Sequence, residues 1–254
     1  MTLHQLNCLV RFYQCFEKTT KPREIDFILL HHMQANNIQH ALDQLYEHKV
    51  STHYLIDDDG NIFQLIDDFD VAFHAGVSYW RGIDGLNKNS LGIEILSSDP
   101  FNKGFNNQQM QSVVEICHHL MLKHQISSRD VVGHSDVAYY KDTGLLDRKQ
   151  DPSHLFNWNY LGINGIGLFP KVNIMHQEDK ILFFNNDLNP EITKIKLRLK
   201  NFGYKVNDIN NCYDEEMQVL ARVFNRHFNP LKYQENSDLW YMSSHFILEN
   251  LLIS

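Results

Sequence analysis

The spacing of hydrophobic residues divides the chain into strand-like and helix-like segments. Short apolar runs and alternating stretches of strand length recur along the first half of the chain, and segments with apolar residues at helical spacing separate them. Strands that alternate with amphipathic helices are typical of an α/β fold, so we expect a mixed central β-sheet flanked by helices. The predicted strands cover residues 25–30, 52–57, 61–66 and 91–96, and the predicted helices cover 38–46 and 108–124.

The last third of the chain shows mainly helical spacing, which predicts a small all-α domain. Residues 194–200 also alternate like a strand, but Gly203 suits the end of a helix and favours the helical interpretation. A glycine-rich run at 162–170 marks the approach to the domain boundary. The predicted helices cover residues 192–202, 215–228 and 238–252. The predicted division is an N-terminal arm at 1–24, a larger α/β domain at 25–176 and a helical domain at 177–254.

Composition and charge exclude several classes of protein. The net charge of −8 disfavours nucleic acid as a partner, because a polyanion is held by a basic surface. The sequence has no apolar run of about eighteen residues, so we expect no transmembrane segment. The four cysteines are scattered without a C-x-x-C pair, which indicates neither a zinc knuckle nor a disulfide framework.

The N-terminal arm does not read as a signal peptide, because polar residues interrupt it before an apolar core forms. We therefore expect a cytoplasmic protein, or a periplasmic one if the start was processed or a signal was removed. Within the arm, Leu6, Leu9, Val10 and Tyr13 are spaced like one face of a helix.

Three potential metal ligands lie near the ends of predicted strands or in a rigid loop. His31 ends the first apolar run, His134 follows Val131-Val132-Gly133, and Asp151 precedes a proline. Two imidazoles and one carboxylate are ordinary zinc ligands, and three protein ligands leave a position for water, as in catalytic sites. The alternative is that each histidine is only a hydrogen-bonded strand-end residue, which is the commoner case in a chain with 15 histidines.

Two further residues are candidates for catalysis. Glu94 lies in the apolar run 91–96 and shares a face with Gly92; a buried carboxylate is costly unless it is paired, near a metal or functional. Pro152 biases Asp151 toward an extended conformation, which would turn Lys149 to the same side as Asp151. A cation and a carboxylate would then face one site.

Five motifs together resemble the zinc-dependent N-acetylmuramoyl-L-alanine amidases of the AmpD/AmiD group. They are IDFILLHH, STHYLIDDDGNIFQLI, VAFHAGVSYWRGIDGLNKNSLGIEI, VVGHSDVA and RKQDPSHLFNW, and the resemblance covers about residues 25–171. The resemblance implies one Zn²⁺ per chain, bound by the family's ligands at His31, His134 and Asp151, with the catalytic residues at Glu94 and Lys149. His32 departs from the family, where tyrosine is frequent, and Ser153-His154 replaces a glycine-containing sequence.

The resemblance also gives a role to the loop that begins at His74. Its aromatic and guanidinium groups suit a substrate that joins a glycan to an acidic peptide, because an aromatic ring stacks on sugar and arginine binds carboxylate. We therefore expect substrate contacts at His74, Tyr79, Trp80 and Arg81. The alternative is that Trp80 seals the core and Arg81 is solvated.

The implied function is hydrolysis of the amide bond between N-acetylmuramic acid, in its ordinary or 1,6-anhydro form, and L-alanine in peptidoglycan or muropeptides. A non-catalytic peptidoglycan recognition protein is the main alternative, and a zinc peptidase is another, although the chain lacks H-E-x-x-H. Residues 201–204 resemble those of small helical peptidoglycan-binding modules. The C-terminal domain has a nearly balanced charge and no candidate catalytic cluster, so we expect it to engage substrate or shield the catalytic domain and to be dispensable for the chemistry.

Overall fold

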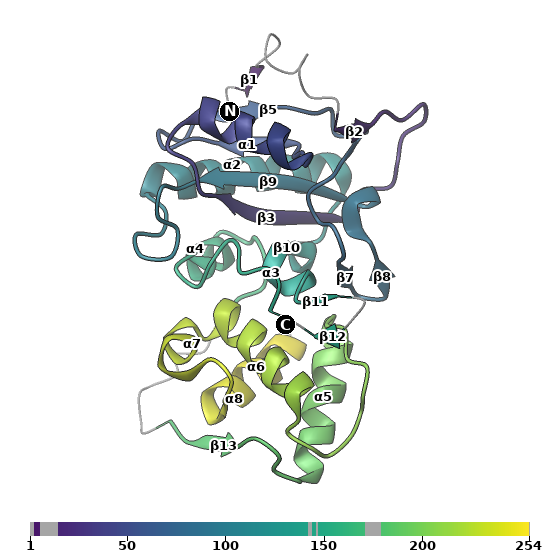
Figure 1. Cartoon of the computed structure of the whole chain (residues 1–254), viewed down its shortest axis with the longest axis vertical. Helices are drawn as coiled ribbons and strands as arrows, with labels where there is room; N and C mark the ends of the chain where they lie inside the picture. The colour runs from purple at the N-terminus through teal and green to yellow at the C-terminus, as the bar shows by residue number, and fades with distance from the viewer. Residues whose placement is uncertain (1–2, 6–14, 142–143, 146, 171–178, 254) are drawn as a thin grey trace.

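The computed structural model describes residues 3–5, 15–141, 144–145, 147–170 and 179–253. The sheet and its helices form the upper part of the molecule in Figure 1, and the C-terminal helices form the lower part. The helical spacing expected at Leu6 to Tyr13 and the domain boundary expected at 176/177 lie outside the described residues, so both stay predictions. None of the helices in the described part of the chain is both long and apolar enough to span a membrane.

A six-stranded mixed sheet forms the centre of the larger domain. Its order is β1-β5-β4-β9-β3-β10, with β4 and β5 antiparallel and the other neighbouring pairs parallel. The β4–β5 connection is the predicted hairpin, in which Gly60 adopts a φ of 80°. The strands are β1 (Leu3–Gln5), β3 (Phe27–Met33), β4 (Tyr54–Ile56), β5 (Ile62–Gln64), β9 (Ser90–Leu96) and β10 (Val131–Gly133). The expected mixed sheet is therefore confirmed.

Helices α1 (Ile38–His48) and α2 (Asn107–His124) cover opposite faces of this sheet. The apolar stripe of α2 packs against Leu91, Ile93 and Ile95 of β9. The apolar stripe of α1 packs against Leu55 and Leu96. Because side chains alternate along a strand, Gly92 and Glu94 lie on the face away from α2. That face is where the polar site forms.

Short elements connect these main ones. They are β2 (Phe16–Glu17), β6 (Val71–Ala72), β7 (Tyr79–Trp80), β8 (Ile83–Asp84), α3 (His134–Val137), β11 (Tyr140–Lys141), β12 (Gly144–Leu145) and α4 (Trp158–Ile163). Two 3₁₀ turns, at Leu86–Lys88 and Ser128–Asp130, complete the domain in the described part of the chain.

The C-terminal part is mainly helical, as expected. Its elements are β13 (Ile181–Phe183), α5 (Pro190–Phe202), α6 (Glu215–Phe228), α7 (Pro230–Asn236), β14 (Trp240–Tyr241) and α8 (Met242–Leu252). The ambiguous segment 194–200 is helical, with Asn189 capping the start of α5. The last helix begins later than predicted because Trp240 and Tyr241 pair with β13 in a small two-stranded sheet.

The C-terminal helices share a hydrophobic core with the larger domain. Trp80 and Val132 belong to the same buried cluster as Phe202, Tyr204 and Phe228. The Trp80 ring meets those of Tyr204 and Phe202 edge-on, with centroids 5.1 and 5.9 Å away. The C-terminal helices therefore pack against the sheet at its edge strand β10. Strand β10 is the neighbour of β3, which in turn pairs with β9.

Candidate active site and metal centre

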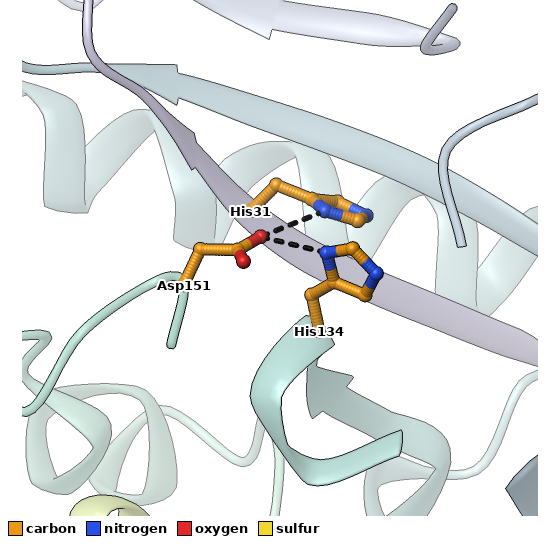
Figure 2. A group of neighbouring side chains, drawn as sticks. All are labelled: His31, His134 and Asp151. Atoms are coloured by element: carbon orange, nitrogen blue, oxygen red, sulfur yellow. Dashed lines mark hydrogen bonds and ion pairs between the residues drawn. The ribbon is translucent and has the colours of Figure 1, made fainter. Parts of the chain in front are cut away.

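Three potential ligands from distant parts of the sequence meet beside the sheet. One potential ligand atom from each of His31, His134 and Asp151 lies within 4.8 Å of the others. A single oxygen of Asp151 lies 3.0 Å from Nδ1 of His31 and 2.9 Å from Nδ1 of His134 (Figure 2). The structure therefore brings together the two imidazoles and the carboxylate that the sequence singled out.

Regular structure and one backbone hydrogen bond hold these residues in place. His31 lies inside β3, which continues through both imidazoles to Met33 and does not end at His31 as expected. His134 is the first residue of α3, directly after β10. The amide of Ser135 donates to the carbonyl of Asp151 at 2.8 Å, so the turn that carries His134 also fixes Asp151.

The hydrogen bond made by Nε2 of His134 decides the protonation of Nδ1, the nitrogen that faces the cluster. The carbonyl of Ala75 can only accept, so Nε2 of His134 donates to it at 3.0 Å. In the neutral ring Nδ1 then carries a lone pair, and it faces a carboxylate oxygen. Two acceptors at this distance need a proton or a metal ion between them. A buried pair of imidazoles with a carboxylate suits a zinc ion, so the residues present fit the metal that the sequence implied.

The ionisation of the cluster agrees with metal binding. Burial lowers the pKa of His31 to about 4, with His134 acting in the same direction, so its ring is neutral at pH 7. Burial alone would raise the pKa of Asp151, but contacts with His134 and His31 bring that pKa well below its usual value. A neutral imidazole and an ionised carboxylate are the forms that bind metal.

Glu94 lies next to the cluster because of the strand register. It is the cross-strand partner of His31 in the parallel β3–β9 pair, and its Oε1 lies 4.0 Å from His31 Nδ1. Its other oxygen, Oε2, is buried without a hydrogen-bond partner among the described residues. Burial raises the pKa of Glu94 to about 8, Asp151 acts in the same direction and Lys149 opposes them. A divalent cation at the cluster would also oppose this rise.

The cluster opens into a cleft of about 280 Å³. Lys149 and Asp151 both line it, in keeping with the expectation that they face the same side. Its wall continues to Gln44 in α1 and to Val50, beyond the end of that helix. The cleft therefore combines a cluster fit for a metal, a buried carboxyl group and a cationic side chain with room for a ligand.

The structure shows contacts for three residues of the loop 74–82 that were expected to bind substrate. Trp80 is only 2% exposed and packs against Phe202 and Tyr204, so it seals the core and does not reach the cleft. Arg81 forms an ion pair with Asp130 at 2.5 Å. Tyr79 lies beneath the ammonium group of Lys205, 5.3 Å from the ring centre. These contacts lie on the side of the C-terminal helices.

His74 does reach the site, but its contact is with a potential ligand. Its Nδ1 lies 3.0 Å from Nε2 of His31, and it also lines the cleft. The ring rests on Gly92, where a Cβ would lie 2.6 Å from the His74 Cγ. Glycine at this position therefore makes room for an imidazole that orients His31.

Sequence reasoning missed Arg148, which ties two loops of the site together. Its guanidinium donates to the carbonyls of Val77 at 2.5 Å and Ala75 at 3.4 Å. Ala75 is also the acceptor for His134, so Arg148 helps to hold in place the carbonyl that receives the hydrogen bond of that ring. The acceptors are backbone carbonyls, which every residue has, so the sequence gives no signal for these contacts.

The mixed sheet carries two imidazoles and a carboxylate that could hold a metal ion, and a buried glutamate lies beside them. This arrangement is typical of a hydrolase site. A comparison with known families identifies which one. The family described as N-acetylmuramoyl-L-alanine amidase matches residues 21–154, more than half of the chain, and the protein belongs to this family.

Individual relatives extend the similarity beyond the matched segment. The N-acetylmuramoyl-L-alanine amidase AmiD of Escherichia coli (strain K12) is 27% identical over 230 residues, covering 83% of this chain and 78% of the relative. The putative N-acetylmuramoyl-L-alanine amidase RC0497 of Rickettsia conorii is 27% identical over 232 residues, covering 89% of this chain and 83% of the relative.

A solved structure matches nearly the whole chain. It is the complex of AmiD from E. coli with the substrate anhydro-N-acetylmuramic acid-L-Ala-D-gamma-Glu-L-Lys, at a TM-score of 0.72 and 25% identity, covering 93% of this chain and 92% of that one. The resemblance therefore includes the C-terminal helices as well as the sheet.

Proposed function

We propose that the protein is a zinc-dependent amidase that hydrolyses the bond between N-acetylmuramic acid and L-alanine. The observation that carries the proposal is the site itself, in which His31, His134 and Asp151 cluster with Glu94 on one face of the sheet. The substrate named for the AmiD complex supports the 1,6-anhydro form among the muropeptides that the enzyme accepts. Cell-wall turnover or recycling is the process that this reaction serves.

The roles of the residues follow from their chemistry. When bound, zinc supplies a low-pKa water and polarises the scissile carbonyl. Glu94 takes a proton from the attacking water and returns it to the leaving amine, as a general base and then a general acid. Lys149, on the wall of the same cleft, stabilises the developing oxyanion with its charge. His74 and the Ala75 carbonyl keep both imidazoles oriented.

Digestion of defined muropeptides tests this proposal. The protein is incubated with intact peptidoglycan, a soluble muropeptide, its 1,6-anhydro form and the free stem peptide, and products are identified by mass spectrometry. We expect release of peptides that begin with L-alanine from at least one muropeptide and no cleavage of the free peptide. A chelator should abolish the reaction and added zinc should restore it.

Two outcomes would replace the proposal with another function. Tight binding of muropeptides without release of peptide would make the protein a recognition protein. Cleavage inside the free stem peptide would make it a peptidase. His134→Ala is the control variant: if it retained full zinc content and full activity, the proposed site would be wrong.

A further inference from the structure

The end of helix α6 carries two adjacent polar residues that are almost completely buried. Arg226 is 2% exposed and His227 is 3% exposed. Burial of a guanidinium reduces stability unless the group is paired and hydrogen-bonded. The partners of Arg226 therefore indicate its structural role. The carboxylate partners of both residues lie across the domain interface, in the two segments that carry His134 and Asp151.

Arg226 contacts the segment that leads into Asp151. Its NH2 forms an ion pair with Oδ2 of Asp147 at 2.5 Å, and its NH1 donates to the backbone carbonyl of Lys149 at 3.3 Å. The guanidinium lies over the ring of Tyr233, 5.0 Å from the centre. Arg226 thus binds the chain at both sides of Arg148, which itself reaches to the loop at Ala75.

His227 contacts the turn that presents His134. Its Nδ1 lies 2.8 Å from Oδ2 of Asp136, and the same oxygen accepts from the amide of Gly133 at 2.7 Å. The imidazole is stacked between the rings of Trp158 and Phe228, with both centroid distances 3.8 Å. Stacking fixes the plane of the ring, so the hydrogen bond fixes Asp136 and with it the start of α3.

We propose that Arg226 and His227 are positioning residues for the active site, and that the C-terminal helices complete the site. Arg226 fixes the backbone from Asp147 to Asp151, and His227 fixes the α3 turn. Lys149, Asp151 and His134 are then held by a helix that contributes no group to the cleft wall. The inference rests on the proposed function for its catalytic consequences, but metal binding tests it separately.

The test compares two arginines on the same helix in the full-length protein. Arg226→Gln removes the ion pair to Asp147 and the bond to the Lys149 carbonyl. Arg222→Gln is the matched control, because Arg222 lies one turn earlier and pairs with Asp238 at 2.7 Å inside the C-terminal part. Zinc affinity by competition with a chelating dye, kcat, KM and thermal unfolding are measured for each.

We expect Arg226→Gln to weaken zinc binding and lower kcat by roughly 10- to 100-fold, the usual cost of losing a group that orients metal ligands. Arg222→Gln should keep both within about twofold of wild type. Asp147→Asn should reproduce the Arg226 effect, and the double variant should lose less than the product of the single losses, since both remove one interaction.

Variants of His227 keep the proposal testable if Arg226→Gln fails to fold. His227→Asn retains a donor near the Nδ1 position, whereas His227→Phe keeps the stacking and removes the donor. The proposal expects the asparagine variant to bind zinc several-fold more tightly than the phenylalanine variant at similar thermal stability. Equal zinc affinity and kcat in both, or wild-type values in Arg226→Gln, would overturn it. If the wild-type protein binds zinc but cleaves no muropeptide, the proposed function fails, and the zinc affinities still decide the positioning role.

Discussion

Glu94 occupies a position where its carboxyl group has few alternatives to a role in chemistry. It is the cross-strand partner of His31, it is 9% exposed, and one of its oxygens has no protein partner among the described residues. A buried carboxyl group without a partner is unfavourable for stability. This environment supports the proposed role of Glu94 in the reaction.

Replacement of Glu94 by glutamine tests this assignment. Glu94→Gln preserves shape and removes the ionisable group, so we expect kcat to fall by roughly 10² to 10⁴-fold while the zinc content and melting temperature stay near those of wild type. Activity assays, elemental analysis and thermal unfolding measure these quantities. Loss of zinc in this variant would identify Glu94 as a ligand instead.

Lys149→Ala separates the oxyanion role from metal binding. Losing one preorganised group of this kind commonly lowers kcat by roughly 10² to 10³-fold, and the change in KM should be smaller. The double variant with Glu94→Gln should lose less than the product of the single losses, because both groups act on one transition state. Strictly multiplicative losses would argue that the two residues act in separate steps.

At the scale of residues, the sequence predicted the site where the chemistry of a residue type was decisive. Imidazoles and a carboxylate near strand ends, and a glutamate inside an apolar strand, are unusual enough to indicate chemistry. The sequence left the roles of Trp80 and Arg81 open because an aromatic ring and a guanidinium serve equally well in a core or an interface. Only the positions of Phe202, Tyr204 and Asp130 in space decide between these uses.

At the scale of elements, strand β9 makes the site possible by combining glycine and glutamate on one face. Gly92 leaves space for the ring of His74, and Glu94 lies two residues further along the same face. The wall of the site is therefore a property of the strand pattern as much as of the loops. The alternation in 91–96 was readable in the sequence, but the ring that fills the space was not.

Gly92→Ala should change the orientation of His31 indirectly, through His74. The added Cβ would lie 2.6 Å from Cγ of His74, so we expect the imidazole to shift, zinc affinity to fall and stability to drop by about 1–3 kcal/mol. The control is the same substitution in a His74→Ala background, where the space is free. If the alanine costs as much stability there as in wild type, the clash with His74 is not the cause.

Hydrophobic spacing predicts the long helices well and the short elements poorly. The long amphipathic helices α2 and α6 begin and end within a residue or two of the expected ranges. Helix α7 and the pair β13–β14 were not predicted, because seven residues or fewer carry too little periodicity. Pairing of Trp240 with β13 depends on a contact across more than fifty positions, which local pattern cannot show.

At the scale of the whole molecule, the C-terminal helices share a core with the larger domain, which bears on the untested expectation that they are dispensable for the chemistry. Trp80, Val132 and Tyr139 are buried in one cluster with residues of α5 and α6. Arg226 and His227 add polar contacts across the same interface. Spacing along the sequence could predict the helices, but it could not show which of their faces meet the catalytic domain.

A chain truncated after Val172 should therefore fail to form an active monomer. Removal of the helices would expose the buried faces of Trp80 and Val132 and deprive Asp147 of Arg226 and Asp136 of His227. We expect aggregation or loss of cooperative unfolding, measured by size-exclusion chromatography and circular dichroism. A stable truncated monomer that cleaves a soluble muropeptide at the wild-type rate would contradict this.

The cluster that joins Trp80 and Val132 to Phe228 also constrains how the protein is made. A ribosome adds roughly 5–20 residues per second, so about 3 to 12 seconds separate the synthesis of Pro170 from that of Phe228. During this interval the sheet can form, but the apolar surface around its last strand has nothing to cover it. Nascent chains of intermediate length should therefore bind chaperones, and the proposed zinc ligands should reach their final arrangement only after α6 has been synthesised.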